Sequence, residues 1–132
     1  MSDILNKDIF ELSNLIKNKS LSPVDIFKQY SKRIAEHENK ISSFIDIYNT
    51  WEDEAKIAEN QISNGNWIGP LHGIPIAVKD LVDVKNKITT IGSTIFKNNI
   101  ATADADVITA LKKAGAIIIG KTHMVEFAFG PH

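Results

Sequence analysis

Apolar residues in the first third of the chain recur at the three- and four-residue spacing of an amphipathic helix. The spacing predicts a helix over residues 7–17 and a second helix that begins at Pro23. Ser22 can cap the free N–H groups of the second helix, Pro23 suits its first position, and Asp25 stands where a capping-box acid belongs. Each helix is expected to bury one face, formed by Ile9, Leu12, Leu15 and Ile16 in the first and by Phe27, Tyr30 and Ile34 in the second.

A third helix is predicted over residues 52–62, and Asn64-Gly65 provide a left-handed stop after it. The apolar, partly β-branched residues 44–48 fit a short strand before this helix. The character of the chain changes near Gly65, which divides it into a mainly helical segment, residues 1–65, and a second segment, residues 66–132. The buried face of the third helix is expected to contain Ala55, Ala58 and Ile62.

Two continuously apolar runs in the second segment, residues 74–78 and 116–119, predict buried strands, the first of them covered on both faces. Pro75 lacks an N–H group, so it is expected near the start of its strand or at a sheet edge. Residues 104–114 predict a helix that Gly115 ends, with Val107, Ile108 and Leu111 facing inward. A strand, a crossover helix and a second strand indicate parallel pairing, so the expected fold class is α/β.

Composition narrows the classes of function. The 132 residues are 43% apolar and 23% charged, which suits one ordinary domain with its own core. The net charge of −1, from 15 basic and 16 acidic residues, predicts no direct nucleic-acid partner and no membrane partner. The absence of cysteine excludes disulfides and thiol nucleophiles, and the four histidines show no metal-ligand spacing, so no metal is expected. Without a signal core or an apolar run long enough to span a bilayer, a cytoplasmic location is expected.

Lys79 is the residue whose position most suggests chemistry. It directly follows the apolar run 74–78 and precedes Asp80. A lysine that loses hydration at the end of a buried strand is deprotonated more easily and can act as a general base. The alternative interpretation is a solvated side chain where the strand leaves the sheet, paired with Asp80. His123 is a weaker candidate, because it lies just past the second predicted strand, where ligand-facing loops of α/β sheets occur.

Three sequence motifs resemble the amidase-signature family, in the order and spacing of that family. Residues 69–80 read GPLHGIPIAVKD and are similar to the segment that bears the family's lysine. Residues 89–93, TTIGS, resemble the short motif that follows it. Residues 104–130 are similar to the family's helix, strand and loop stretch, and the helices before residue 69 are less specifically alike. The chain therefore resembles the N-terminal portion of an amidase domain, with the first strands and crossover helix of its mixed sheet, incomplete.

The resemblance implies an amide hydrolase that cleaves carbon–nitrogen bonds with a Ser–cis-Ser–Lys triad, in which Lys79 is the catalytic lysine. It implies a small-molecule amide substrate and no cofactor. The family's two serines lie in a downstream Gly/Ser-rich segment, and no serine here matches those positions. Residues 1–132 alone are therefore expected to be inactive. The expected protein partner is either the missing C-terminal part of the domain or a second copy of the chain in a homo-oligomer.

Two other interpretations stay open. The A subunit of an aspartyl/glutamyl-tRNA amidotransferase shares the family signature. That subunit commonly has Asn after its Lys-Asp pair and Asn at the position of His123, whereas this sequence has Leu81 and His123. These two positions are more typical of a stand-alone amidase. A catalytically inactive, truncated product is the interpretation from another class, because the serine motif is not present.

Overall fold

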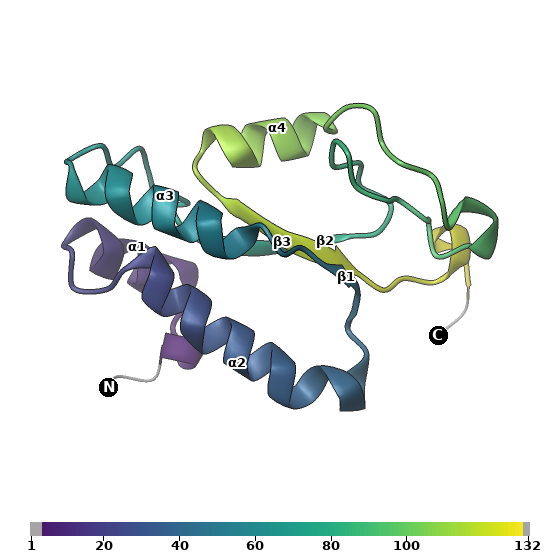
Figure 1. Ribbon diagram of the computed structural model, residues 1–132, viewed down its shortest axis with the longest axis horizontal. Helices are drawn as coiled ribbons and strands as arrows, with labels where there is room; N and C mark the ends of the chain where they lie inside the picture. The colour runs from purple at the N-terminus through teal and green to yellow at the C-terminus, as the bar shows by residue number, and fades with distance from the viewer. Residues whose placement is uncertain (1–3, 131–132) are drawn as a thin grey trace.

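The computed structural model describes residues 4–130, which form a mixed three-stranded sheet between helices (Figure 1). The β-strands and α-helices are α1 (Ile9–Lys17), α2 (Pro23–Ile41), β1 (Phe44–Ile47), α3 (Trp51–Ser63), β2 (Pro75–Lys79), α4 (Asp106–Lys113) and β3 (Ile117–Thr122). Short 3-10 helices span Ile4–Asn6, Thr94–Phe96 and Glu126–Ala128. No helix within residues 4–130 is long and apolar enough to cross a membrane.

The capping residues predicted for α2 are confirmed. The Asp25 N–H donates to Ser22 Oγ at 3.0 Å, and the Ser22 N–H donates to the Asp25 carboxylate at 3.3 Å. The helix begins at Pro23, as predicted, because its missing N–H is not needed in the first turn. The predicted stripe of α2 is only half-buried, whereas Ile26 is fully buried.

The first predicted helix is present, but one residue of its buried face is wrong. α1 starts one residue after the cap Asp8 and buries Leu12 and Ile16. Ile9 is 50% exposed, because it lies in the first turn, beyond the residues that α1 packs into the core. In α3 the predicted face is confirmed, since Ala55, Ala58 and Ile62 are all buried.

The strand pairing predicted for the second segment is confirmed. β2 and β3 are parallel, with Pro75 opposite Ile117 and Lys79 opposite Thr122, and α4 lies between them in the chain. β1 adds an antiparallel strand on the other side of β3, so the strand order is β1-β3-β2 and the sheet is mixed. Pro75 is the first residue of its strand, where it removes no central hydrogen bond.

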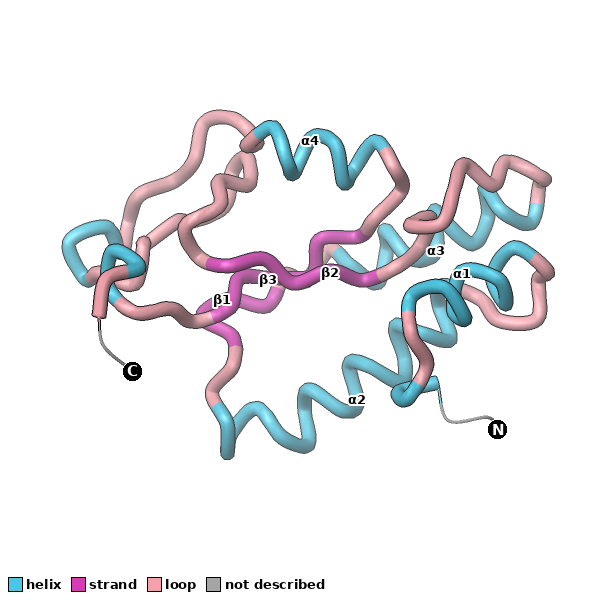
Figure 2. The backbone as a smooth tube through the Cα atoms, turned by 180° about the vertical axis from the view of Figure 1, so that it is seen from behind, coloured by secondary structure: helices cyan, strands magenta, loops and turns pink. Residues whose placement is uncertain are grey.

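The central strand β3 is buried on both faces, and this explains the layered arrangement. Ile117 and Ile119 pack in a cluster with side chains of α2 and α3, whereas Ile118 packs with Ile108 of α4 in a second cluster. Figure 2 likewise shows α4 and α2 on opposite sides of the sheet. The strictly alternating side-chain direction of a strand thus sends successive isoleucines into two different cores.

Two expectations about burial in this region are wrong. β2 is not covered on both faces: it lies at an edge of the three-stranded sheet, and Ala77 is exposed while Val78 is buried. Val107 is 53% exposed, because the eight-residue helix α4 turns only a narrow face, centred on Ile108, toward the sheet. Apolar composition alone does not indicate that part of a strand or helix surface stays uncovered.

Gly120 allows β1 to approach β3 closely. A Cβ atom at this position would lie 2.3 Å from the Asp46 carbonyl oxygen and 3.1 Å from Ile47 Cα. We expect Gly120→Ala to lower the free energy of unfolding by about 1–3 kcal/mol, because backbone rather than a flexible side chain must move. Ala77→Ser is the matched control, since it adds one atom on the exposed face of the neighbouring strand and should change stability little. Thermal unfolding of both variants checks this, and equal losses would contradict it.

Candidate active site

Lys79 lies at the carboxyl end of β2, with its side chain exposed. The alternation along the strand buries Val78 and turns Lys79 to the open face. The Lys79 carbonyl oxygen accepts from the Val82 N–H at 3.0 Å, so the chain turns directly after the strand. Among the side-chain contacts of residues 4–130, the Lys79 amine has neither a hydrogen bond nor an ion pair. The amine is therefore free to meet a group from outside this part of the chain.

A shallow hollow of about 490 Å³ lies beside Lys79. Its lining consists of Lys79, His123, Met124, Val125 and Ala128. The structure thus brings Lys79 and His123, two residues singled out in the sequence, to the same hollow, because parallel strands end at the same edge of the sheet. Glu126 and Phe127, two residues of the same family-like stretch, are exposed in the short 3-10 helix at one side of this region.

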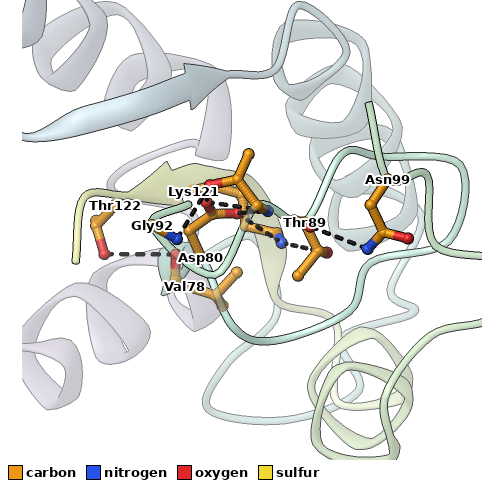
Figure 3. Close-up of polar contacts among 8 residues, drawn as sticks. Val78, Asp80, Thr89, Gly92, Asn99, Lys121 and Thr122 are labelled. Atoms are coloured by element: carbon orange, nitrogen blue, oxygen red, sulfur yellow. Dashed lines mark hydrogen bonds and ion pairs between the residues drawn. The ribbon is translucent and has the colours of Figure 1, made fainter. Parts of the chain in front are cut away.

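Lys79 is exposed where the strand ends, as in the alternative interpretation of this residue, but it does not pair with Asp80. Asp80 is 1% exposed and turns inward, where its carboxylate lies 3.5 Å from the amine of Lys121, which is itself 0% exposed (Figure 3). The Lys121 amine also donates to Thr89 Oγ1 at 2.9 Å. Burial lowers the pKa of the Lys121 ammonium, and the Asp80 carboxylate opposes that shift. Lys121, rather than Lys79, is the buried lysine of this edge of the sheet.

The sequence analysis does not single out Lys121, because nothing in the sequence around it distinguishes it from an ordinary charged residue after an apolar run. Strand topology could have indicated it. Asp80 and Lys121 each come at the end of an apolar run, and the ends of two adjacent parallel strands lie side by side. A negative and a positive side chain at neighbouring strand ends are therefore within reach of each other.

The loop after β2 folds back onto Asp80. The Thr90 N–H donates to both carboxylate oxygens of Asp80 at 3.2 Å, and the Thr90 hydroxyl donates to one of them. The Ile91 N–H donates to the Asp80 carbonyl oxygen at 3.0 Å. Asp80 thus accepts hydrogen bonds through its side chain and its backbone from two consecutive loop residues.

The same loop is joined to the segment beside the hollow. The Phe127 N–H donates to the Ile91 carbonyl oxygen at 2.9 Å. A Cβ atom on Gly92 would lie 2.9 Å from the Met124 carbonyl oxygen, so only glycine fits this close approach. Ile91 has φ +56°, a conformation that is unfavourable for a β-branched residue. The motif at residues 89–93 therefore links Asp80 to the hollow beside Lys79.

His72, in the turn before β2, is buried and both of its ring nitrogens have polar partners. It is 2% exposed, its Nδ1 accepts from the Ile68 N–H at 3.3 Å, and its Nε2 lies 3.0 Å from Gln61 Oε1. Burial lowers the pKa of this imidazole. Within the described residues, no three His, Asp or Glu side chains gather as a set of metal ligands.

Comparison with known proteins gives consistent matches. The sequence profile of the family described as Amidase matches residues 25–132. The chain is 38% identical over 128 residues to the A subunit of the glutamyl-tRNA(Gln) amidotransferase from Methylobacillus flagellatus, a match that covers 96% of the chain and 26% of that protein. It thus spans about a quarter of the length of this curated relative.

Solved structures agree with the fold. The native peptide amidase from Stenotrophomonas maltophilia superposes with a TM-score of 0.88 at 26% identity, over 95% of this chain and 26% of that one. An amidase family protein from Bacillus anthracis superposes with a TM-score of 0.86 at 31% identity, over 94% of this chain and 25% of that one. The mixed sheet, with its helices, is therefore an arrangement found in these enzymes.

The different exposure of the two lysines can be measured directly. We expect Lys79 to react with a small amount of acetic anhydride in the folded protein, because its amine is exposed and unpaired, whereas Lys121 should stay unmodified. Peptide mapping by mass spectrometry reads out both sites. The control is the same reaction in denaturant, where both lysines should be acetylated. Early modification of Lys121 in the folded protein would contradict its burial.

Proposed function

Because this chain belongs to the amidase family, we propose that it supplies the catalytic lysine, Lys79, of an enzyme that cleaves amide carbon–nitrogen bonds. One observation carries the proposal. Lys79 ends the strand formed by the family-like motif at residues 73–80, and its amine is exposed and unpaired beside a hollow. The amine of Lys121, by contrast, is buried and paired with Asp80, so it is not available beside the hollow.

In the proposed mechanism Lys79 acts as the general base. Its neutral amine accepts a proton through the family's bridging serine, and the nucleophilic serine attacks the amide carbonyl to form an acyl-enzyme. Lys79 then returns the proton to the leaving amine, and water releases the acid. Backbone N–H groups stabilise the tetrahedral oxygen. The serines and these donors are expected in the family's downstream segment, so the complete protein carries the activity, and no cofactor is required.

The open hollow adds a condition to this mechanism. Only a neutral amine can accept a proton. The side chain of Lys79 is exposed within residues 4–130. The desolvation that favours the neutral amine must therefore come from the rest of the domain or from bound substrate. Residues downstream would complete the site in two ways, by bringing the serines and by covering Lys79.

We expect Lys79→Arg in the full-length protein to lower amide turnover by about a thousandfold or more, because base and nucleophile act as a unit and guanidinium does not release its proton. Turnover of aliphatic and aromatic amides measures the effect. Lys113→Arg is the matched control: it makes the same change at an exposed lysine of α4 and should leave turnover intact. Residues 1–132 expressed alone should give only background. If Lys79→Arg keeps more than a tenth of the wild-type rate, Lys79 is not the base.

The second candidate is the A subunit of a tRNA-dependent amidotransferase. The curated relative from Methylobacillus flagellatus favours it, since that protein bears this name and is 38% identical. Leu81 and His123 favour the stand-alone amidase, because the amidotransferase commonly has Asn at both positions. His123 is the more informative of the two, since it lines the hollow beside Lys79.

The two candidates differ in what the purified full-length protein does by itself. A stand-alone amidase should hydrolyse small amides without any added protein, and charged tRNA should not change its rate. The amidotransferase component should instead release ammonia from an amide donor efficiently only when its partner subunits and glutamyl-tRNA(Gln) are present. Measuring ammonia release under both conditions separates them. Dependence on tRNA would overturn the amidase assignment, even though Lys79 would keep its role.

A further inference from the structure

Asp80 is held through both its backbone and its side chain, although it follows the exposed Lys79. Its backbone N–H donates to the Thr122 carbonyl oxygen at 3.2 Å, and its carbonyl oxygen accepts from Ile91 at 3.0 Å. Its carboxylate accepts from Thr90 and faces Lys121 (Figure 3). Each polar group of Asp80 therefore has a partner, and those partners come from β3 and from the loop after β2.

Lys121 and Thr89 complete this arrangement from two other parts of the chain. Figure 3 shows Lys121, Asp80 and Thr89 directed toward one another between the loop and the end of the sheet. The Thr89 backbone is held in turn by Asn99. The Thr89 N–H donates to the Asn99 backbone carbonyl oxygen at 2.9 Å, and the side-chain amide of Asn99 donates to the Thr89 carbonyl oxygen at 3.0 Å. The hydroxyl that Lys121 contacts is thereby placed on a fixed backbone.

The energetics suggest that this unit does more than stabilise the fold. Removing two charges from water is costly, and well-packed apolar residues often replace a buried ion pair without loss of stability. Apolar side chains do not, however, reproduce the directional hydrogen bonds of a buried ion pair. Lys121 and Thr90 donate to the Asp80 carboxylate, and Lys121 also donates to Thr89 Oγ1. These directed bonds orient Asp80, and the peptide bond joins Asp80 to Lys79.

We propose that Asp80, Lys121 and Thr89 form a positioning unit that fixes the backbone from which Lys79 extends, and so sets where its amine stands during amide cleavage. The inference rests on the proposed role of Lys79. None of the three residues touches the substrate in this proposal. They act through the end of β2 and through the loop at residues 89–92, which also holds the segment beside the hollow. A displacement of about 1 Å in a reacting group can cost on the order of a hundredfold in rate.

The test compares Thr89→Val with Thr89→Ser in the full-length protein. Valine keeps the shape but removes the acceptor of the Lys121 amine, whereas serine keeps the hydroxyl. We expect Thr89→Val to lower kcat by about 10- to 100-fold with KM nearly unchanged, and Thr89→Ser to retain most of the activity. Thr109→Val makes the same change on the exposed surface of α4 and is the matched control. All rates are measured at a temperature at which circular dichroism shows each variant to be folded.

Lys121→Met is a second variant, which removes the ammonium and keeps the length of the side chain. It should lower kcat at least as much as Thr89→Val, and if it does not fold, the Thr89 pair decides alone. Folded variants that keep kcat within twofold of wild type would overturn the positioning role. A rise in KM with unchanged kcat would overturn it as well. The outcome for Lys79→Arg separates the two proposals. An inactive Lys79→Arg beside a fully active Thr89→Val defeats only this inference, whereas an active Lys79→Arg defeats both.

Discussion

The buried ion pair between Lys121 and Asp80 is the constraint on which this end of the molecule depends. An uncompensated charge costs several kcal/mol when it leaves water, and losing one partner of a buried pair typically costs about 3–5 kcal/mol. Here the two side chains are 0% and 1% exposed, so neither can be hydrated instead. Thr89 and Thr90 supply the remaining hydrogen bonds. β2, β3 and the intervening loop must therefore come together as one arrangement, although the paired residues lie 41 positions apart.

The pleat of β2 then gives two adjacent residues opposite surroundings. Val78 is buried, Lys79 is exposed, and Asp80 turns inward where the strand ends. A one-residue slip of β2 against β3 would exchange these surroundings and place Lys79 among the buried groups. The ion pair opposes such a slip, because the slip would leave the buried Lys121 ammonium without the Asp80 carboxylate. The exposed amine is in this sense a consequence of the buried pair beside it.

Local chemistry in the sequence is sufficient for many elements, whereas the wrong predictions concern which surfaces stay exposed and which side chains pair. Ser22, Pro23 and Asp25 predict the start of α2 correctly, since capping involves residues within one turn. The parallel pairing of β2 and β3 also follows from the strand, helix and strand pattern. The partner of Asp80 does not, because proximity in the sequence favours Lys79 whereas the register of two strands brings Lys121. The catalytic role of Lys79 came from family resemblance and stays a prediction.

Residues other than glycine with positive φ angles occur at this end of the sheet, as well as at Lys19, Ser42 and Asn86 elsewhere in the chain. Ile91, Phe127 and Ala128 all have positive φ angles, between 53° and 56°, which cost roughly 1–3 kcal/mol each for residues other than glycine. Such conformations persist only where surrounding contacts over-determine them. Ile91 satisfies this condition, because its N–H bonds to Asp80 and its carbonyl oxygen to Phe127. The strained residues thus connect the buried ion pair to the segment beside the hollow at Lys79.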